Sequence, residues 1–158
     1  MDMEARGHSE HPEALRLWLR LLTCTQLVEK QVRTQLREQF DTTLPRFDLM
    51  AQLERNPEGL KMNELSRRMM VTGGNVTGIT DQLVAEELVE RVNVEGDRRA
   101  WRVRLTPRGR KLFNEMAQQH EAWIVDAFGG LSAKEVTQLH KLLGKVKQHS
   151  HQQTTETA

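Results

Sequence analysis

The residues with the clearest chemical potential form a basic cluster in the second half of the chain. Six arginines and one lysine, with no acidic residue, lie between Arg98 and Lys111, although the whole chain has a net charge of only +1. The cluster opens with Asp97-Arg98-Arg99 directly after Gly96, a sequence typical of a tight turn. Guanidinium groups on a turn can enter the minor groove of DNA, where a narrow groove strengthens the negative potential. A local stripe of this kind matters more for phosphate contact than net charge does.

A second group of candidate residues lies on a stretch of helical period, residues 74–87. Its apolar residues fall on one side, and glycines and small polar residues fall on the other. A glycine costs about 1 kcal/mol inside a helix, so outward glycines indicate a close approach to another surface. The major groove of DNA admits a helix and meets the residues of its N-terminal end. Arg67, which lies shortly before this stretch, is a candidate for contact with phosphate. The full set of predicted DNA contacts is Arg67, Thr72, Gly74, Asn75, Thr77, Gly78, Thr80, Asp97, Arg98 and Arg99.

Two short helices are expected to position the second group. The apolar spacing predicts one helix over residues 62–70 and another over 74–87, with residues 71–73 as the turn between them. Thr72 is the expected N-cap of the second helix, because its hydroxyl can accept a hydrogen bond from a free backbone N–H group there. This arrangement is that of a helix-turn-helix, whose second helix reads DNA.

A β-hairpin is expected to carry the basic cluster. After Leu88 the apolar residues recur at every second position, first over residues 92–94 and again over 101–105, with a turn at 95–98. Arginines alternate with the apolar residues on the way back. The hairpin should therefore have one apolar face and one cationic face. A helix-turn-helix followed by such a hairpin is a winged helix-turn-helix, and we assign it to residues 45–105.

Further helices are predicted on both sides of this module. Residues 12–39 carry apolar side chains at three- and four-residue steps, on two sides of one long helix. A shorter helix should begin after Thr43, its expected N-cap, with Pro45 in the first turn. Residues 56–59, Asn-Pro-Glu-Gly, should end it.

The C-terminal third is predicted to hold two more helices. Thr106-Pro107 should begin the first of them. Ser132-Ala133-Lys134-Glu135 has the sequence of a capping box, so a last helix should start there. The two ends of the chain, residues 1–11 and 149–158, are polar and are expected to be disordered.

The predicted fold is mainly α with a small β-hairpin wing and about six helices. By its length the chain should form a single domain over residues 1–158. The helices over 12–40 and 107–148 have apolar faces beyond what one small core needs, so we expect them to pair two chains as a homodimer.

Several classes of protein are excluded by what the sequence lacks. Cys24 is the single cysteine, so an internal disulfide is impossible. We find no apolar run near the roughly 18 residues of a membrane span and no secretion signal, and expect a cytoplasmic protein. We also find no nucleophile with a base, no phosphate loop and no metal-ligand spacing. The sequence predicts no enzyme, no metal site and no cofactor.

The motifs described above resemble those of the MarR family of bacterial transcriptional regulators. Asp97-Arg98-Arg99-Ala100 followed by Leu105-Thr106-Pro107-Arg108-Gly109 matches the family's D-R-R-A…L-T-x-x-G run, and the resemblance covers about residues 12–148. It implies a homodimer on double-stranded DNA, with one winged module in each half-site of a pseudo-palindrome. It also implies that a wing arginine enters the minor groove and that Asp97 orients the arginines. The helix near residue 62 lacks the family's usual Ser or Thr cap; either Asn63 replaces it or the boundary shifts.

A small-molecule effector follows from the same resemblance. Residues 42–55 and 69–78 are closest to family members that govern aromatic-compound breakdown, which suggests an aromatic carboxylate or its coenzyme A thioester. Such an anion needs an apolar slot with a paired cation. The candidate ligand-binding residues are Arg16, Trp18, Arg46, Met70, His120 and Trp123. We interpret the protein as a repressor released by its ligand, although the same contacts would serve an activator.

Two alternatives stay open at this point. A thiol-sensing regulator would use Cys24, but an activated cysteine needs a nearby cation or donor, and the chain has no tyrosine of the kind that peroxide-sensing relatives use. We therefore expect Cys24 to be a small buried residue. The second alternative is an architectural DNA-binding protein without a ligand, whose DNA affinity no metabolite would change.

Overall fold

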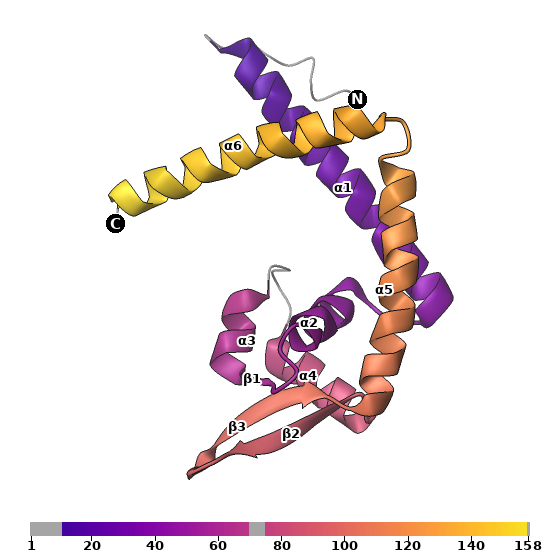
Figure 1. The fold of residues 1–158 in the computed structure, drawn as a ribbon, viewed down its shortest axis with the longest axis vertical. Helices are drawn as coiled ribbons and strands as arrows, with labels where there is room; N and C mark the ends of the chain where they lie inside the picture. Colours follow the sequence, from indigo (N-terminus) through magenta and orange to yellow (C-terminus); the bar gives the residue numbers. More distant parts are fainter. Residues whose placement is uncertain (1–10, 70–74, 158) are drawn as a thin grey trace. The chain divides into compact units, whose positions relative to one another are not determined.

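The computed structural model describes residues 11–69 and 75–157, with the side chains of positions 98 and 99 excepted. Its elements are labelled in Figure 1. The chain divides into two compact units, Met1–Glu121 and Ala122–Ala158. In chain order the elements are α1 (Pro12–Phe40), α2 (Leu44–Glu54), β1 (Leu60–Lys61), α3 (Met62–Arg68), α4 (Val76–Ala85), β2 (Val89–Val94), β3 (Asp97–Leu105), α5 (Pro107–Ala127) and α6 (Ala133–Thr157). The predicted fold, mainly α with a small β wing, is confirmed.

The long first helix is confirmed, and it is only partly covered. Among the described residues of α1, Val32 and Leu36 are buried, close to its C-terminal end. Leu17, Trp18 and Leu27 are 65%, 54% and 57% exposed. Most of the apolar stripe of α1 therefore lies open in the single chain.

α2 begins as the sequence predicts. The Thr43 hydroxyl accepts a hydrogen bond from the Arg46 backbone N–H at 3.4 Å, and Pro45 occupies the first turn. After α2 the chain turns at Gly59, whose φ is +97° and whose Cβ, if it had one, would lie 2.7 Å from the Val103 carbonyl oxygen. Only glycine combines this φ with so close an approach of two backbones. β1 begins directly after this turn, at Leu60.

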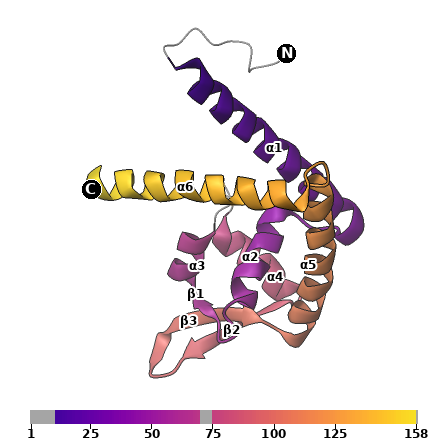
Figure 2. The same ribbon diagram turned by 45° about the horizontal axis from the view of Figure 1, so that its top comes forward.

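The sheet has three antiparallel strands in the order β1-β3-β2 (Figure 2). The hairpin of β2 and β3 was predicted, but β1 was not, because two residues are too few for an alternating pattern. The hairpin turn is also shorter than expected: Val94 pairs with Asp97, so Glu95 and Gly96 alone form the turn, and Asp97 already belongs to β3. Gly96 has a φ of +84°, a left-handed backbone conformation that favours glycine.

The core of the first unit lies between this sheet and the helices packed on it. Its fully or nearly fully buried side chains come from the C-terminal part of α1, from α2, β1, α3, α4, β2 and β3, and from the first half of α5. They include Leu49, Met50, Leu53, Leu65, Leu83, Val89, Val103, Phe113 and Met116. Phe47 adds an aromatic contact, because its ring stacks on Phe113 with 5.5 Å between centroids. Because the hairpin and α4 share this core, the wing and the second helix of the helix-turn-helix are held by the same packing.

In the second unit, the predicted capping box is present. The Ser132 N–H donates to Glu135 Oε1 at 3.0 Å, and the Glu135 N–H donates to Ser132 Oγ at 3.2 Å. The hydrogen bonds from the backbone and hydroxyl of Ser132 lower the pKa of Glu135. None of the residues of α6 is buried in the single chain.

The prediction of a disordered C-terminal tail was wrong. α6 continues to Thr157. Neither proline nor glycine interrupts the chain after Gly144, and each further residue of a helix that has already formed adds a hydrogen bond at little cost. The hydroxyls of Thr154, Thr155 and Thr157 each donate to the carbonyl four residues before them. Residues 1–10, whose disorder was also predicted, lie outside the described residues.

Candidate nucleic-acid interface

The N-terminus of α4 is fixed by Asn75 rather than by Thr72. Asn75 Oδ1 accepts a hydrogen bond from the Gly78 N–H at 2.9 Å, so Asn75 is the N-cap and α4 begins at Val76, not at residue 74. Asparagine is among the best N-cap residues. Thr72 and Gly74, which were predicted to contact DNA, lie outside the described residues.

Gly78 has a reason to be glycine within the protein itself. A Cβ at this position would lie 2.8 Å from Asn75 Nδ2 and 3.1 Å from Asn75 Cγ. The missing side chain therefore makes room for the cap. Sequence reasoning explained Gly78 only by a close approach to DNA.

Thr80 was predicted to contact DNA, but the structure places it in the core. Its side chain is fully buried, and its hydroxyl donates to the Val76 carbonyl at 2.7 Å. Thr80 thus faces the core, whereas Thr77, three residues before it, is exposed. Asn75 and Thr77 are exposed, so the first turn of α4 still presents polar groups outward.

The C-terminal half of α4 uses its polar side chains within the module. Asp81 forms an ion pair with Arg91 of β2. Glu86, the C-cap residue, forms one with Arg46 of α2, and Gln82 Oε1 accepts a weaker hydrogen bond from Arg46 Nη1 at 3.5 Å. These interactions with other elements all involve the C-terminal half of α4. The polar surface that α4 presents outward is therefore its first turn. These interactions were not predicted, because nothing in the sequence links positions that lie 10 to 40 residues apart.

α3 supplies two exposed arginines at its C-terminal end, Arg67 and Arg68. Arg67 Nε lies 3.4 Å from the Asn63 carbonyl oxygen, a weak hydrogen bond within the helix. Asn63 does not replace the missing cap: the N-cap residue is Lys61, without a side-chain hydrogen bond, and the Asn63 carboxamide instead accepts from the Glu64 N–H.

The wing is the β2–β3 hairpin, and its polar face is less cationic than predicted. Arg104 Nε donates to Glu90 Oε1 at 2.7 Å across the hairpin, so one arginine of this face is neutralised by the facing strand. Asp97 is exposed beside the turn, and positions 98 and 99 follow it in β3. Trp101 is 46% exposed, unlike Val103 and Leu105 on the same face, because the core ends before it.

Five of the six predicted effector residues are described by the structure, and they belong to α1, α2 and α5. Arg16 and Trp18 are exposed on α1, Trp123 belongs to the second unit, and Met70 lies outside the described residues. His120 of α5 packs against the Phe47 ring, with 4.9 Å between centroids, and burial lowers its pKa.

Among the predicted effector residues that the structure describes, Arg46 lines a cavity of about 510 Å³ in the first unit. Its walls are the ends of four helices, and its side chains are of mixed character: Phe40, Asp41, Thr42, Arg46, Met50, Ala85, Glu86, Glu87, Leu88, Arg108, Lys111, Leu112, Glu115 and Met116. Arg46 is mostly buried, with 17% of its side chain exposed, and it is paired with Glu86. Arg46, the cation predicted to bind the effector, is thus already paired with the Glu86 carboxylate.

Cys24 is exposed on α1, so the prediction that it is buried was wrong for the single chain. Among the described residues no group of three or more His, Cys, Asp and Glu side chains could hold a metal ion. None of the described helices is long and apolar enough to cross a membrane.

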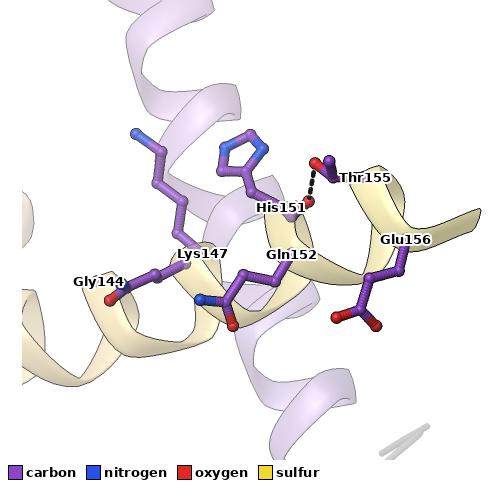
Figure 3. A pocket seen from close by; sticks show the side chains of 7 residues that line it. Gly144, Lys147, His151, Gln152, Thr155 and Glu156 are labelled. Carbon is purple, nitrogen blue, oxygen red and sulfur yellow. Dashed lines mark hydrogen bonds between the residues drawn. The ribbon is translucent and has the colours of Figure 1, made fainter. Parts of the chain in front are cut away.

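Figure 3 shows a groove on the second unit that offers no enclosed site. All of its lining residues, among them Lys147, His151 and Thr155, come from α6 and are exposed. The dashed line is the hydrogen bond from the Thr155 hydroxyl to the His151 carbonyl, 3.0 Å long and internal to the helix.

Comparison with known proteins agrees with the geometry. The MarR family model matches residues 40–100, which hold α2, the helix-turn-helix and most of the wing. The transcriptional activatory protein BadR of Rhodopseudomonas palustris is 31% identical over 134 residues, which cover 82% of this chain and 76% of BadR. The chain belongs to the MarR family. MarR proteins are DNA-binding transcriptional regulators rather than enzymes, so this chain is a DNA-binding regulator.

Two further similarities extend this result beyond the winged module. The HTH-type transcriptional regulator PecS of Dickeya dadantii is 30% identical over 105 residues, which cover 65% of this chain and 63% of PecS. The crystal structure of a MarR family transcriptional regulator from Silicibacter pomeroyi matches with a TM-score of 0.76 and 28% identity, covering 91% of this chain and 99% of that one. The long helices outside the module therefore belong to the MarR fold as well.

Proposed function

We propose that the protein is a ligand-responsive repressor that binds a pseudo-palindromic operator as a homodimer. The observation that carries the proposal is an exposed, polar first turn of α4 beside a wing, on a chain whose terminal helices leave their apolar residues open. As a regulator of transcription it would act in the cytoplasm.

The proposed DNA contacts fall into two groups. Asn75, Thr77 and the backbone at Gly78 would meet base edges in the major groove, with Thr72 and Gly74 approaching the same groove. Arg98 and Arg99 would enter the adjacent minor groove, oriented by Asp97, and Arg67 would contact phosphate. Only the roles of Asp97, Arg98 and Arg99 are carried over from the family motif. Those of the other residues rest on their places in the helix-turn-helix.

The proposed dimer is supported by exposed apolar side chains on two helices. Leu17, Trp18 and Leu27 of α1 are more than half exposed, and so are Leu142 and Val146 of α6. Exposed apolar surface that recurs along helices marks a surface for association. Pairing two chains through such faces would place two winged modules on one operator.

The proposed effector is a small aromatic carboxylate or its coenzyme A thioester. The cavity beside Arg46 has an apolar part from Met50, Leu88 and Met116. Its wall also carries the cations Arg108 and Lys111, together with four carboxylates, those of Asp41, Glu86, Glu87 and Glu115. A carboxylate bound at Arg46 would compete with Glu86, which caps the C-terminus of α4. Ligand binding would thus loosen the link between α2 and the reading helix.

The test is a gel shift with the DNA upstream of the protein's own gene, with and without benzoate and benzoyl-coenzyme A. We expect binding that falls with salt, prefers the specific sequence over random DNA and is relieved by one of the two compounds. Binding without sequence preference would contradict the regulator. Binding that neither compound relieves would contradict the proposed effector class and favour a DNA-binding protein without such a ligand.

An activator is the second candidate, because a relative that matches 82% of the chain, BadR, is named as a transcriptional activatory protein. Transcription in vitro from the upstream promoter separates the two: a repressor lowers the transcript level, and an activator raises it.

A further inference from the structure

The turn that ends α4 has an unusual residue at its critical position. The Leu88 N–H donates to the Leu83 carbonyl and the Glu87 N–H to the Val84 carbonyl, each at 3.0 Å, the hydrogen bonds of a Schellman motif. Glu87 therefore takes a left-handed φ of +61°, where glycine is the usual residue. The carbonyls of Glu87 and Leu88 lie beyond the helix, and their hydrogen-bond partners come from another element.

Thr106 supplies both partners. Its N–H donates to the Leu88 carbonyl at 3.1 Å, and its hydroxyl donates to the Glu87 carbonyl at 2.7 Å. The same hydroxyl oxygen accepts from the Gly109 N–H at 3.0 Å, which makes Thr106 the N-cap of α5. One hydroxyl group thus closes the C-terminal turn of the reading helix and begins the next helix.

Gly109 allows this contact to be as close as it is. It is buried, and a Cβ there would lie 1.9 Å from the Leu88 carbonyl oxygen. The backbone of α5 therefore rests directly on the turn after α4. Arg108 adds an ion pair to Glu87 at 3.5 Å, but both side chains are largely exposed, so this pair contributes little.

We propose that Thr106 is a positioning residue for DNA recognition: its hydroxyl fixes the orientation of α4 relative to α5. This inference rests on the proposed dimeric binding to a pseudo-palindrome. Such a dimer reads two half-sites about one helical turn of DNA apart, so the separation of its two reading helices must match the operator. If the turn after α4 is loosened, the reading helix of each protomer can change its orientation. The dimer would then discriminate less between operators with different spacings of the half-sites.

The hydroxyl can be tested with matched variants of the full chain. Thr106→Val keeps the shape and removes the hydroxyl, and Thr106→Ser keeps the hydroxyl. Thr106→Asp keeps an acceptor for the Gly109 N–H, and so the start of α5, but its carboxylate has no donor for the Glu87 carbonyl. It therefore separates the two roles and serves as a second variant if Thr106→Val folds poorly.

The measurement is fluorescence anisotropy on three DNA duplexes: the operator defined by footprinting the wild-type protein, and versions with one base pair added or removed between half-sites. Circular dichroism first establishes a temperature at which the variants are folded. Thr106→Asp loses the hydrogen bond to the Glu87 carbonyl, and Thr106→Val loses that bond and the one from the Gly109 N–H. Losing the bond to the Glu87 carbonyl in each protomer should weaken binding to the natural operator about 5-fold per protomer, or about 25-fold for the dimer, and Thr106→Val should bind at least as weakly. Thr106→Val and Thr106→Asp should also lose most of the preference for natural spacing, and Thr106→Ser should keep it.

The ratio of affinities between spacings is decisive, because a purely structural defect lowers binding to all three duplexes alike. Folded Thr106→Val and Thr106→Asp proteins with the wild-type spacing preference would overturn the inference and leave the proposed function intact. A wild-type protein with no spacing preference would contradict the proposed dimeric recognition itself.

Discussion

The seat of Gly109 against the turn after α4 gives a specific prediction for stability. Gly109 lies in the first turn of α5, against the Leu88 carbonyl group. Gly109→Ala would place a methyl group 1.9 Å from that oxygen and 2.8 Å from its carbon. Both contacts are with backbone, so no side chain can rotate away, and the start of α5 has to move.

The expected cost follows from the size of that movement. The contact must lengthen from 1.9 Å to the 3.4 Å of ordinary van der Waals contact, a shift of 1.5 Å. Overpacking of this kind costs about 1–3 kcal/mol or more, and the weakened Thr106 hydrogen bonds add about 1 kcal/mol each. Alanine recovers about 1 kcal/mol in helix propensity. We expect a net loss of about 3 kcal/mol, which lowers Tm by about 6–12 °C in a chain of this size.

Thermal unfolding followed by circular dichroism at one fixed protein concentration measures this loss. Gly144→Ala in α6 is the matched control, because nothing lies within 4 Å of a Cβ there. The same substitution should raise stability by about 0.5–1 kcal/mol at that position. A Gly109→Ala protein with the Tm of the wild type would refute the close contact between α5 and the turn.

Three other predictions concern the interface and pH. Asn75→Asp should keep the cap and the stability, since a carboxylate is favoured at a helix N-terminus, yet bind DNA more weakly in anisotropy titrations. Equal or tighter binding would contradict the proposed contact of Asn75 with DNA. Arg98→Ala should weaken operator binding by about 1–3 kcal/mol, and an unchanged Kd would remove the wing contact at that residue. His120 should contribute to acid sensitivity: burial lowers its pKa, so stability is full above its unfolded value near 6.5 and falls as pH drops through the folded value. His120→Gln should flatten urea-unfolding stability between pH 7 and 5, and an unchanged slope would contradict this.

Periodicity and capping motifs in the sequence were enough to predict most of the fold. Thr43 and the Ser132–Glu135 box mark helix starts because their hydrogen bonds join residues three positions apart. β1 was not predicted because it is only two residues long. Its pairing with β3 also joins Leu60 to Val103, which lie far apart in the sequence. The end of α6 was misjudged because polar composition was taken as disorder, although the helix merely continues.

The candidate site was less predictable than the fold. Assigning Thr80 to the DNA-facing side failed because its hydroxyl can satisfy itself on the preceding turn and let the side chain be buried. Arg46 was predicted to bind the effector, and its pairing with Glu86 was not predicted, because that pairing depends on how two helices distant in sequence pack. Long-range ion pairs of this kind leave no periodic signal in a sequence.

Hydroxyl-radical footprinting of the upstream DNA shows whether two chains read two half-sites through α4 and the wing. We expect two protected patches related by a pseudo-twofold axis, about 10 base pairs apart from centre to centre, with protection of the flanking minor grooves that Arg98→Ala reduces. A single protected patch, or even protection along the whole fragment, would contradict recognition by two chains.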